Sequence, residues 1–165
     1  MKTVLRLALL LALIAAGYWV WTVMSPTPQT VIRKRLQKMA QIASFSPGQG
    51  MISKVTAIER LGTFFSEDAE VVVDVPGVGS HVFNRREEIN QALMAAKSSI
   101  SSLKAEFPDI NVEVAASKLS AIASVTLEAS VNGQKDLIVQ ELKLSIKKIN
   151  GDWLVTKVET VRTLK

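Results

Sequence analysis

The second half of the chain alternates apolar and polar residues in the way that is typical of β-strands. In residues 119–131 every odd position is apolar and the even positions are mostly polar. This period of two places the apolar side chains on one face, so that face is buried and the other lies in solvent. Four strands are expected in all, over about 103–115, 119–131, 137–149 and 153–164. The dipeptides Asn132-Gly133 and Asn150-Gly151 predict tight hairpin turns between the last three.

The region before these strands shows the longer repeat of amphipathic helices. Thr27 and Pro28 are the residue types of an N-cap and a first helical position, and apolar residues then recur every three or four positions as far as Ala43. A second helix is expected over about 50–65. A third helix begins after Asn84, where Glu87 completes a capping box.

Two short strands complete the expected element order, one over 70–75 and one over 81–83, on either side of a loop that contains Gly77 and Gly79. Helices therefore come first and long strands last. The pattern predicts the α+β class, with three helices packed on one face of a curved antiparallel sheet and the other face solvated.

Residues 1–24 form a separate unit. Residues 7–24 carry no charge, and one tyrosine and two tryptophans gather near the end of this run. Its length is close to the roughly 20 residues that cross a hydrocarbon core, and aromatic rings of this kind favour headgroup depth. We therefore expect a transmembrane signal-anchor helix over 1–24, a linker over 25–28 and one domain over 29–165.

Two properties of this segment stay open in the sequence. Ala15-Ala16-Gly17 could supply a signal-peptide cleavage site, although an uncleaved anchor accounts better for the full length and the aromatic residues. Lys2 and Arg6 favour a cytoplasmic N-terminus, whereas basic residues after the span favour the opposite orientation. Because a short basic start before an apolar run is the usual export signal, we expect a single-pass membrane protein whose domain lies on the extracytoplasmic, periplasmic side.

The net charge of +5 arises at the two flanks of the apolar segment. Four basic residues, which we call the basic collar, follow the segment: Arg33, Lys34, Arg35 and Lys38. The rest of the chain, from about residue 39, has 14 basic and 15 acidic residues. A solvated helix face is the plainer interpretation of the collar, and contact with anionic lipid headgroups, worth about 1 kcal/mol per charge, is the functional one. No nucleic-acid partner is expected, because no aromatic residues interleave with the basic ones.

Three stretches carry a resemblance to a known family. Residues 58–76 (IERLGTFFSEDAEVVVDVP) have the character of a helix running into a strand, residues 85–96 (RREEINQALMAA) that of a helix after its loop, and residues 129–159 that of final hairpins ending in INGDWLVTKVE. With the element order, they resemble the nuclear transport factor 2-like superfamily, a cone-shaped α+β fold that includes the SnoaL-like cyclases and ketosteroid isomerases. The resemblance covers about 28–165. It implies a cone with a pocket and leaves the activity open, because the superfamily is functionally mixed.

The candidate catalytic residues are Asp74 and His81. Asp74 interrupts an apolar strand, so its carboxylate lies either at the mouth of the cone with a raised pKa or in an ion pair. His81 is the only histidine, and a solvent-exposed loop histidine is its plainer interpretation. The resemblance implies that enzymes of the superfamily use Asp–His or Tyr–Asp sets, but the only tyrosine, Tyr18, lies in the expected anchor. The sequence has no cysteine, no cluster of metal ligands and no phosphate-binding glycine loop, so we expect neither metal nor cofactor.

These observations favour a membrane-anchored, non-catalytic domain that binds a protein partner or a small apolar ligand, or forms homo-oligomers through its open sheet face. The layout of short tail, single span and exported domain also resembles that of VirB8-like subunits of bacterial secretion channels. The alternative is a pocket enzyme of the SnoaL or ketosteroid isomerase kind, in which Asp74 and His81 meet inside an apolar cavity. A third hypothesis is a sensor of lipid surfaces built on the basic collar.

Overall fold

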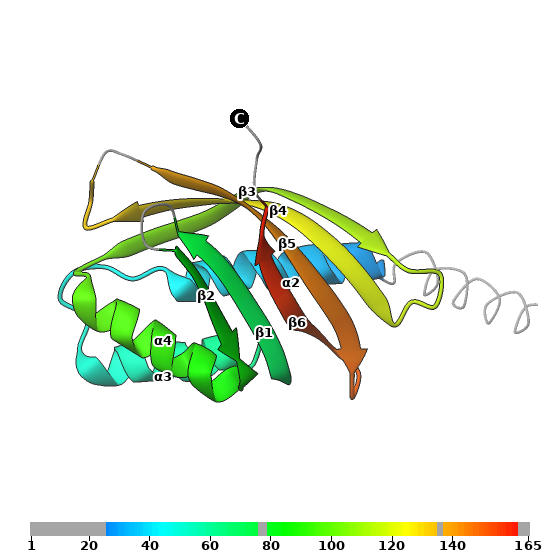
Figure 1. Cartoon of the computed structure of the whole chain (residues 1–165), viewed down its shortest axis with the longest axis horizontal. Coiled ribbons are helices and arrows are strands. Elements are labelled where there is room, and N and C mark those ends of the chain that lie inside the picture. The colour runs from blue at the N-terminus through cyan, green and yellow to red at the C-terminus, as the bar shows by residue number, and fades with distance from the viewer. Residues whose placement is uncertain (1–25, 76–78, 135–136, 162–165) are drawn as a thin grey trace, which may run out of the picture.

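The computed structural model describes residues 26–75, 79–134 and 137–161. Its elements are α2 (Pro28–Ala43), α3 (Met51–Gly62), β1 (Phe65–Val75), β2 (Gly79–Asn84), α4 (Arg85–Ser99), β3 (Leu103–Val114), β4 (Ser120–Val131), β5 (Ile138–Ile149) and β6 (Asp152–Thr160). Figure 1 shows a strongly curved sheet with α3 and α4 next to each other at one end and α2 running along the strands. The α+β class with three helices and a curved sheet is therefore as expected.

The six strands form one sheet in the order β2-β1-β6-β5-β4-β3. Every neighbouring pair is antiparallel except β1 and β6, which are parallel. The expectation of a purely antiparallel sheet is therefore wrong, and the sheet is mixed. The physical reason is that tight hairpins impose antiparallel pairing, whereas β1 and β6 are joined by most of the domain and can meet in either direction.

The local signals in the sequence form the turns and caps that they predict. The Thr27 hydroxyl accepts a hydrogen bond from the N–H of Thr30 at 3.4 Å at the start of α2. Asn132 and Asn150 have φ values of 54° and 51°, and the glycine after each also has a positive φ. Two successive left-handed residues are what a type I′ hairpin requires, and asparagine followed by glycine adopts them at the least cost.

The boundary between α3 and β1 lies earlier than expected. The helix ends at Gly62 instead of near residue 65, and the strand begins at Phe65 instead of residue 70. Phe64 and Phe65 are both buried. Both belong to the hydrophobic core, Phe64 from the turn that follows α3 and Phe65 from the first position of β1, so the helix ends before the two rings instead of carrying them on one face.

The third helix also begins differently from the expected capping box. Glu88 Oε2, rather than the Glu87 carboxylate, accepts the hydrogen bond from the N–H of Asn84 at 2.8 Å. Arg85 lies between them with a φ of 68°, outside the helical region, so regular helix starts one residue later. The glutamate that reaches back is accordingly one residue later too.

The core lies between the inner face of the sheet and the helices. Its most deeply buried large side chains are Ile32 of α2 and Leu144 of β5. The expected transmembrane segment over 1–24 lies outside the described residues. Within the part of the chain that is described, no helix combines the length and the apolar character needed to cross a membrane.

Candidate functional site

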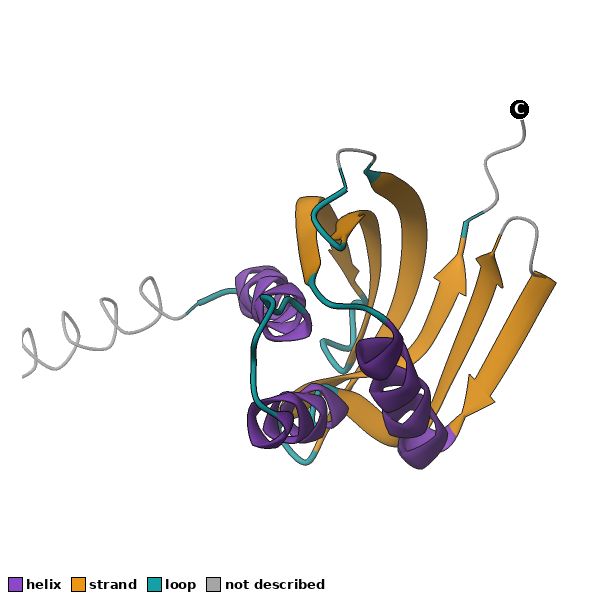
Figure 2. Ribbon diagram, turned by 90° about the vertical axis from the view of Figure 1, so that its left-hand side faces the viewer, coloured by secondary structure: helices purple, strands orange, loops and turns teal. Residues whose placement is uncertain are grey.

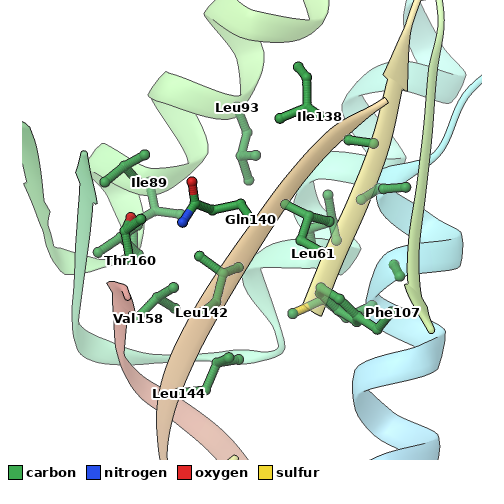
Figure 3. Close-up of a pocket in the computed structure, with 18 of the residues that line it drawn as sticks. Leu61, Ile89, Leu93, Phe107, Ile138, Gln140, Leu142, Leu144, Val158 and Thr160 are labelled. Atoms are coloured by element: carbon green, nitrogen blue, oxygen red, sulfur yellow. The ribbon is translucent and has the colours of Figure 1, made fainter. Parts of the chain in front are cut away.

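A cavity of about 450 Å³ lies between the inner face of the sheet and the helices. Met39 and Ala43 of α2 form part of its helical wall. Leu93 of α4 and Leu142 and Leu144 of β5 also line it, as Figure 3 shows. In the described part of the chain, every residue that lines it is apolar except Asp74, Gln140 and Thr160. Its volume falls within the range of about 300–1,000 Å³ that is usual for pockets that bind small molecules.

The cavity lies where the sheet separates into two groups of strands, beyond the last residue of β6. Thr160, the last residue of β6, pairs with Leu142, so the preceding residues of β5 pair with β4 alone among the described strands. Figure 2 shows the ends of the two groups of strands diverging at this point. The inner positions of β3 and β4 here include Ala105 and Ala129, whose small side chains leave space unfilled. The cavity reaches the surface beside Ile138, which is 56% exposed.

The polar groups of the cavity are gathered near the division in the sheet. The Thr160 hydroxyl accepts a hydrogen bond from the N–H of Asp74 at 3.2 Å and donates one to the Val72 carbonyl at 3.4 Å. The Gln140 side-chain amide donates to the Val161 carbonyl at 3.4 Å, and in Figure 3 it points toward the side where Thr160 lies. The cavity therefore has a polar rim on this side and an apolar interior.

The structure brings one of the two candidate catalytic residues to the cavity. Asp74 is half-buried and lines it. Antiparallel pairing places Asp74 opposite Ser80 and His81 opposite Val73, so the Asp74 and His81 side chains face opposite sides of the β1–β2 hairpin. His81 is exposed, and its ring stacks on that of Phe83 with 6.5 Å between centroids. Among the described residues no three histidine or carboxylate side chains are grouped so that they could hold a metal ion.

The basic collar divides into two arginines that contact the domain and two lysines that face solvent. Arg33 donates a hydrogen bond to the carbonyl of Ile110 at 3.0 Å. The guanidinium of Arg35 lies 5.0 Å from the centroid of the Phe64 ring. The side chains of both collar lysines are exposed. Part of the collar charge therefore also stabilises the packing of α2 against the sheet.

A pair of lysines that the sequence pattern did not single out lies where α4 ends and α3 begins. Lys97 in the last turn of α4 is only 4% exposed, and its ammonium lies 4.9 Å from the centroid of the Phe45 ring. The ammonium of Lys54 lies 5.6 Å from the same centroid and donates a hydrogen bond to the Lys97 carbonyl at 3.5 Å. We call Lys54 and Lys97 the lysine pair.

The Lys97 ammonium has no hydrogen-bond partner within the described ranges. Burial lowers the pKa of Lys97, and the nearby charge of Lys54 lowers it further. A lysine in a helix normally indicates a solvated face. The one signal that could have revealed this residue is its spacing, because Ile89, Leu93 and Lys97 follow one another at intervals of four along the buried face of α4.

Comparison with known proteins identifies the fold. The sequence matches no protein-family model and no curated protein. A nuclear transport factor 2-like protein of unknown function from Pseudomonas putida has a TM-score of 0.63 at 10% identity, with 81% of this chain and 85% of that chain covered. A putative scytalone dehydratase from Novosphingobium aromaticivorans gives 0.59 at 15% identity, with 80% and 83% covered.

An uncharacterized protein with a cystatin-like fold from Caulobacter vibrioides also gives a TM-score of 0.59, at 22% identity, with 80% of this chain and 88% of that chain covered. Identities this low establish the fold and leave the function open, because one fold supports many activities. The chain has the nuclear transport factor 2-like fold, also described as cystatin-like.

Proposed function

We propose that this chain is a membrane-anchored, non-catalytic domain that holds a small apolar ligand in its cavity. The observation that carries the proposal is the cavity of about 450 Å³ with three polar lining residues grouped near its rim. At about 30 Å³ for each water-sized group, the space accepts roughly fifteen non-hydrogen atoms. Water gains little in such a space, because few polar partners line it, so an apolar molecule is the favoured occupant.

The arrangement favours binding over catalysis. An enzyme of the SnoaL or ketosteroid isomerase kind needs an acid or base beside the substrate and a second group that stabilises the developing charge. Asp74 is the one ionisable residue that lines the cavity in the described part of the chain, and the other polar lining residues are the neutral Gln140 and Thr160. His81 is exposed and is not one of the residues that line the cavity.

Membrane attachment through residues 1–24, with the domain on the periplasmic side, completes the proposal. Pro28 begins α2 four residues after the apolar run, whereas the cavity is lined by Met39 and Ala43 near the other end of this helix. At about 1.5 Å per residue the cavity lies roughly 17–23 Å along α2 from the anchored end. Self-association or a protein partner on the open sheet face, as in a VirB8-like subunit, remains a further prediction.

The test is a titration of the full chain, held in lipid nanodiscs, with dodecan-1-ol, followed by methyl NMR. The methyl signals of Ile89 and Ile138, which line the cavity, should shift and saturate. The signal of Ile122, on the outer face of β4, should not shift. The substitution Leu93→Trp fills the cavity and should weaken binding by at least about tenfold, which is about 1.4 kcal/mol. The matched control is Met94→Trp at the adjacent, 37% exposed position, which should leave binding unchanged. Equal binding by the two variants would exclude the cavity as the site.

A further inference from the structure

We propose that the ligand of the cavity is an aliphatic carboxylate, whose tail fills the apolar space and whose acidic group is bound by the lysine pair beside Phe45. The inference rests on the proposed function and specifies its ligand class. It starts from the positive charges of the lysine pair. Neither Lys54 nor Lys97 forms an ion pair with a carboxylate in the described part of the chain. The two positive charges beside this aromatic ring therefore lack a negative charge that would balance them among the described residues.

Three residues that line the cavity are close neighbours of the lysine pair or of Phe45. Leu93, which lines the cavity, lies one helical turn before Lys97 on the same face of α4. Leu103, which also lines it, exchanges two backbone hydrogen bonds with Phe45, at 2.8 and 3.0 Å. Ala43, a third lining residue, lies two residues before Phe45. These neighbours place the lysine pair near this end of the cavity, although neither lysine is among the residues that line it.

A bound carboxylate would supply what the lysine pair lacks. Lys97 is only 4% exposed, and its ammonium has no hydrogen-bond partner among the described residues. Burying this charge without a partner lowers the stability of the domain, and a charge-assisted hydrogen bond to a carboxylate would remove that loss. To reach a carboxylate in the cavity, the four-carbon side chain of Lys97 would turn away from the Phe45 ring by changes of its side-chain torsions. Lys54 is half-buried and adds a second positive charge on the same side. An uncharged lipid would gain none of these interactions.

A purely structural role for the lysine pair leads to different expectations. Each ammonium also interacts with the face of the Phe45 ring, an interaction worth about 0.5–2 kcal/mol. If this were its whole contribution, replacing Lys97 would change stability and leave the choice of ligand unaffected. The two roles are therefore separated by ligand preference.

The experiment compares dodecanoate with dodecan-1-ol, which share a tail and differ in charge, by the methyl NMR titration of the full chain in nanodiscs. Dodecanoate has about fourteen non-hydrogen atoms, close to the roughly fifteen that the cavity accepts. The wild-type chain should bind dodecanoate about tenfold more tightly than dodecan-1-ol. Lys97→Met should remove that preference by weakening the binding of dodecanoate, and Lys54→Met should reduce it. The control is Lys104→Met on β3, whose exposed ammonium pairs with Glu106 at 3.0 Å, and it should keep the wild-type preference.

The outcomes separate this inference from the function on which it rests. If dodecan-1-ol shifts the Ile89 and Ile138 signals and dodecanoate binds no more tightly, the carboxylate inference is wrong and apolar binding stands. A preference that persists in Lys97→Met would overturn the assignment of the acidic group to the lysine pair. If neither compound shifts these signals, both proposals fail.

Discussion

Replacing Lys97 by methionine should stabilise the domain. Methionine keeps an unbranched chain of similar length in the 4% exposed position and removes the unpartnered ammonium. An unsatisfied buried polar group costs about 1–3 kcal/mol, whereas the lost interaction with the Phe45 ring is worth about 0.5–2 kcal/mol. Burial increases both terms, but methionine also removes the repulsion between the Lys97 and Lys54 ammonium charges. We expect the free energy of unfolding to rise by about 1 kcal/mol.

The assay is urea unfolding of the full chain, followed through the folded-state methyl signals. With a denaturant slope of about 2 kcal/mol per molar, the midpoint should rise by roughly 0.5 M. The pH dependence gives an independent check. The folded-state pKa of Lys97 lies below its ordinary value of 10.5, so the unfolded chain binds more protons between the two values. The wild-type chain therefore gains stability from this residue as the pH rises through that window, and the advantage of methionine should shrink toward pH 10.5. A less stable variant, or an advantage independent of pH, would refute the reasoning.

Three further substitutions test other features of the fold, each by the same urea assay. Gly62→Ala should change the stability by no more than about 1 kcal/mol, because the added Cβ would lie 2.9 Å only from the end of the Asn90 side chain, which can turn away, and alanine is favoured over glycine in a helix; a larger loss that Asn90→Ala recovers would show that Asn90 is held in place. Arg85→Gly should stabilise the domain by about 0.5 kcal/mol. Glycine adopts a φ of 68° without the steric cost that arginine has, although its greater conformational freedom in the unfolded chain offsets part of this gain. A loss of stability above about 1 kcal/mol would show that Arg85 makes an important contact. Thr160→Val should cost about 1 kcal/mol by removing the hydroxyl that joins the ends of β1 and β6, and an unchanged midpoint would show that this bridge adds nothing.

Features that depend on neighbouring residues could be predicted from the sequence. The cap at Thr27 and the turns at Asn132 and Asn150 follow from local side-chain and backbone chemistry. The regular alternation in β4 predicts its buried face for the same reason, since strand geometry repeats every two residues. The parallel pairing of β1 with β6 has no such signal, because it depends on how distant segments pack.

The candidate site could be predicted only in outline. Apolar residues at Leu93, Leu142 and Leu144 indicate inward-facing positions, but an alternating pattern is the same whether the space between such side chains is filled or empty. The cavity arises from where β6 ends relative to β5, which is a property of register rather than of composition. Lys97 was missed because a charged residue in a helix usually faces solvent.

The position of β6 has a consequence for how the chain matures. This last strand lies in the middle of the sheet, between β1 and β5. Until it is synthesised, the β1–β2 hairpin and the β3–β5 sheet cannot join, and each exposes an unpaired edge that favours aggregation. Contacts this distant along the chain also slow folding. A nascent or prematurely terminated chain that lacks β6 would thus leave the β1 and β5 edges unpaired at the centre of the domain.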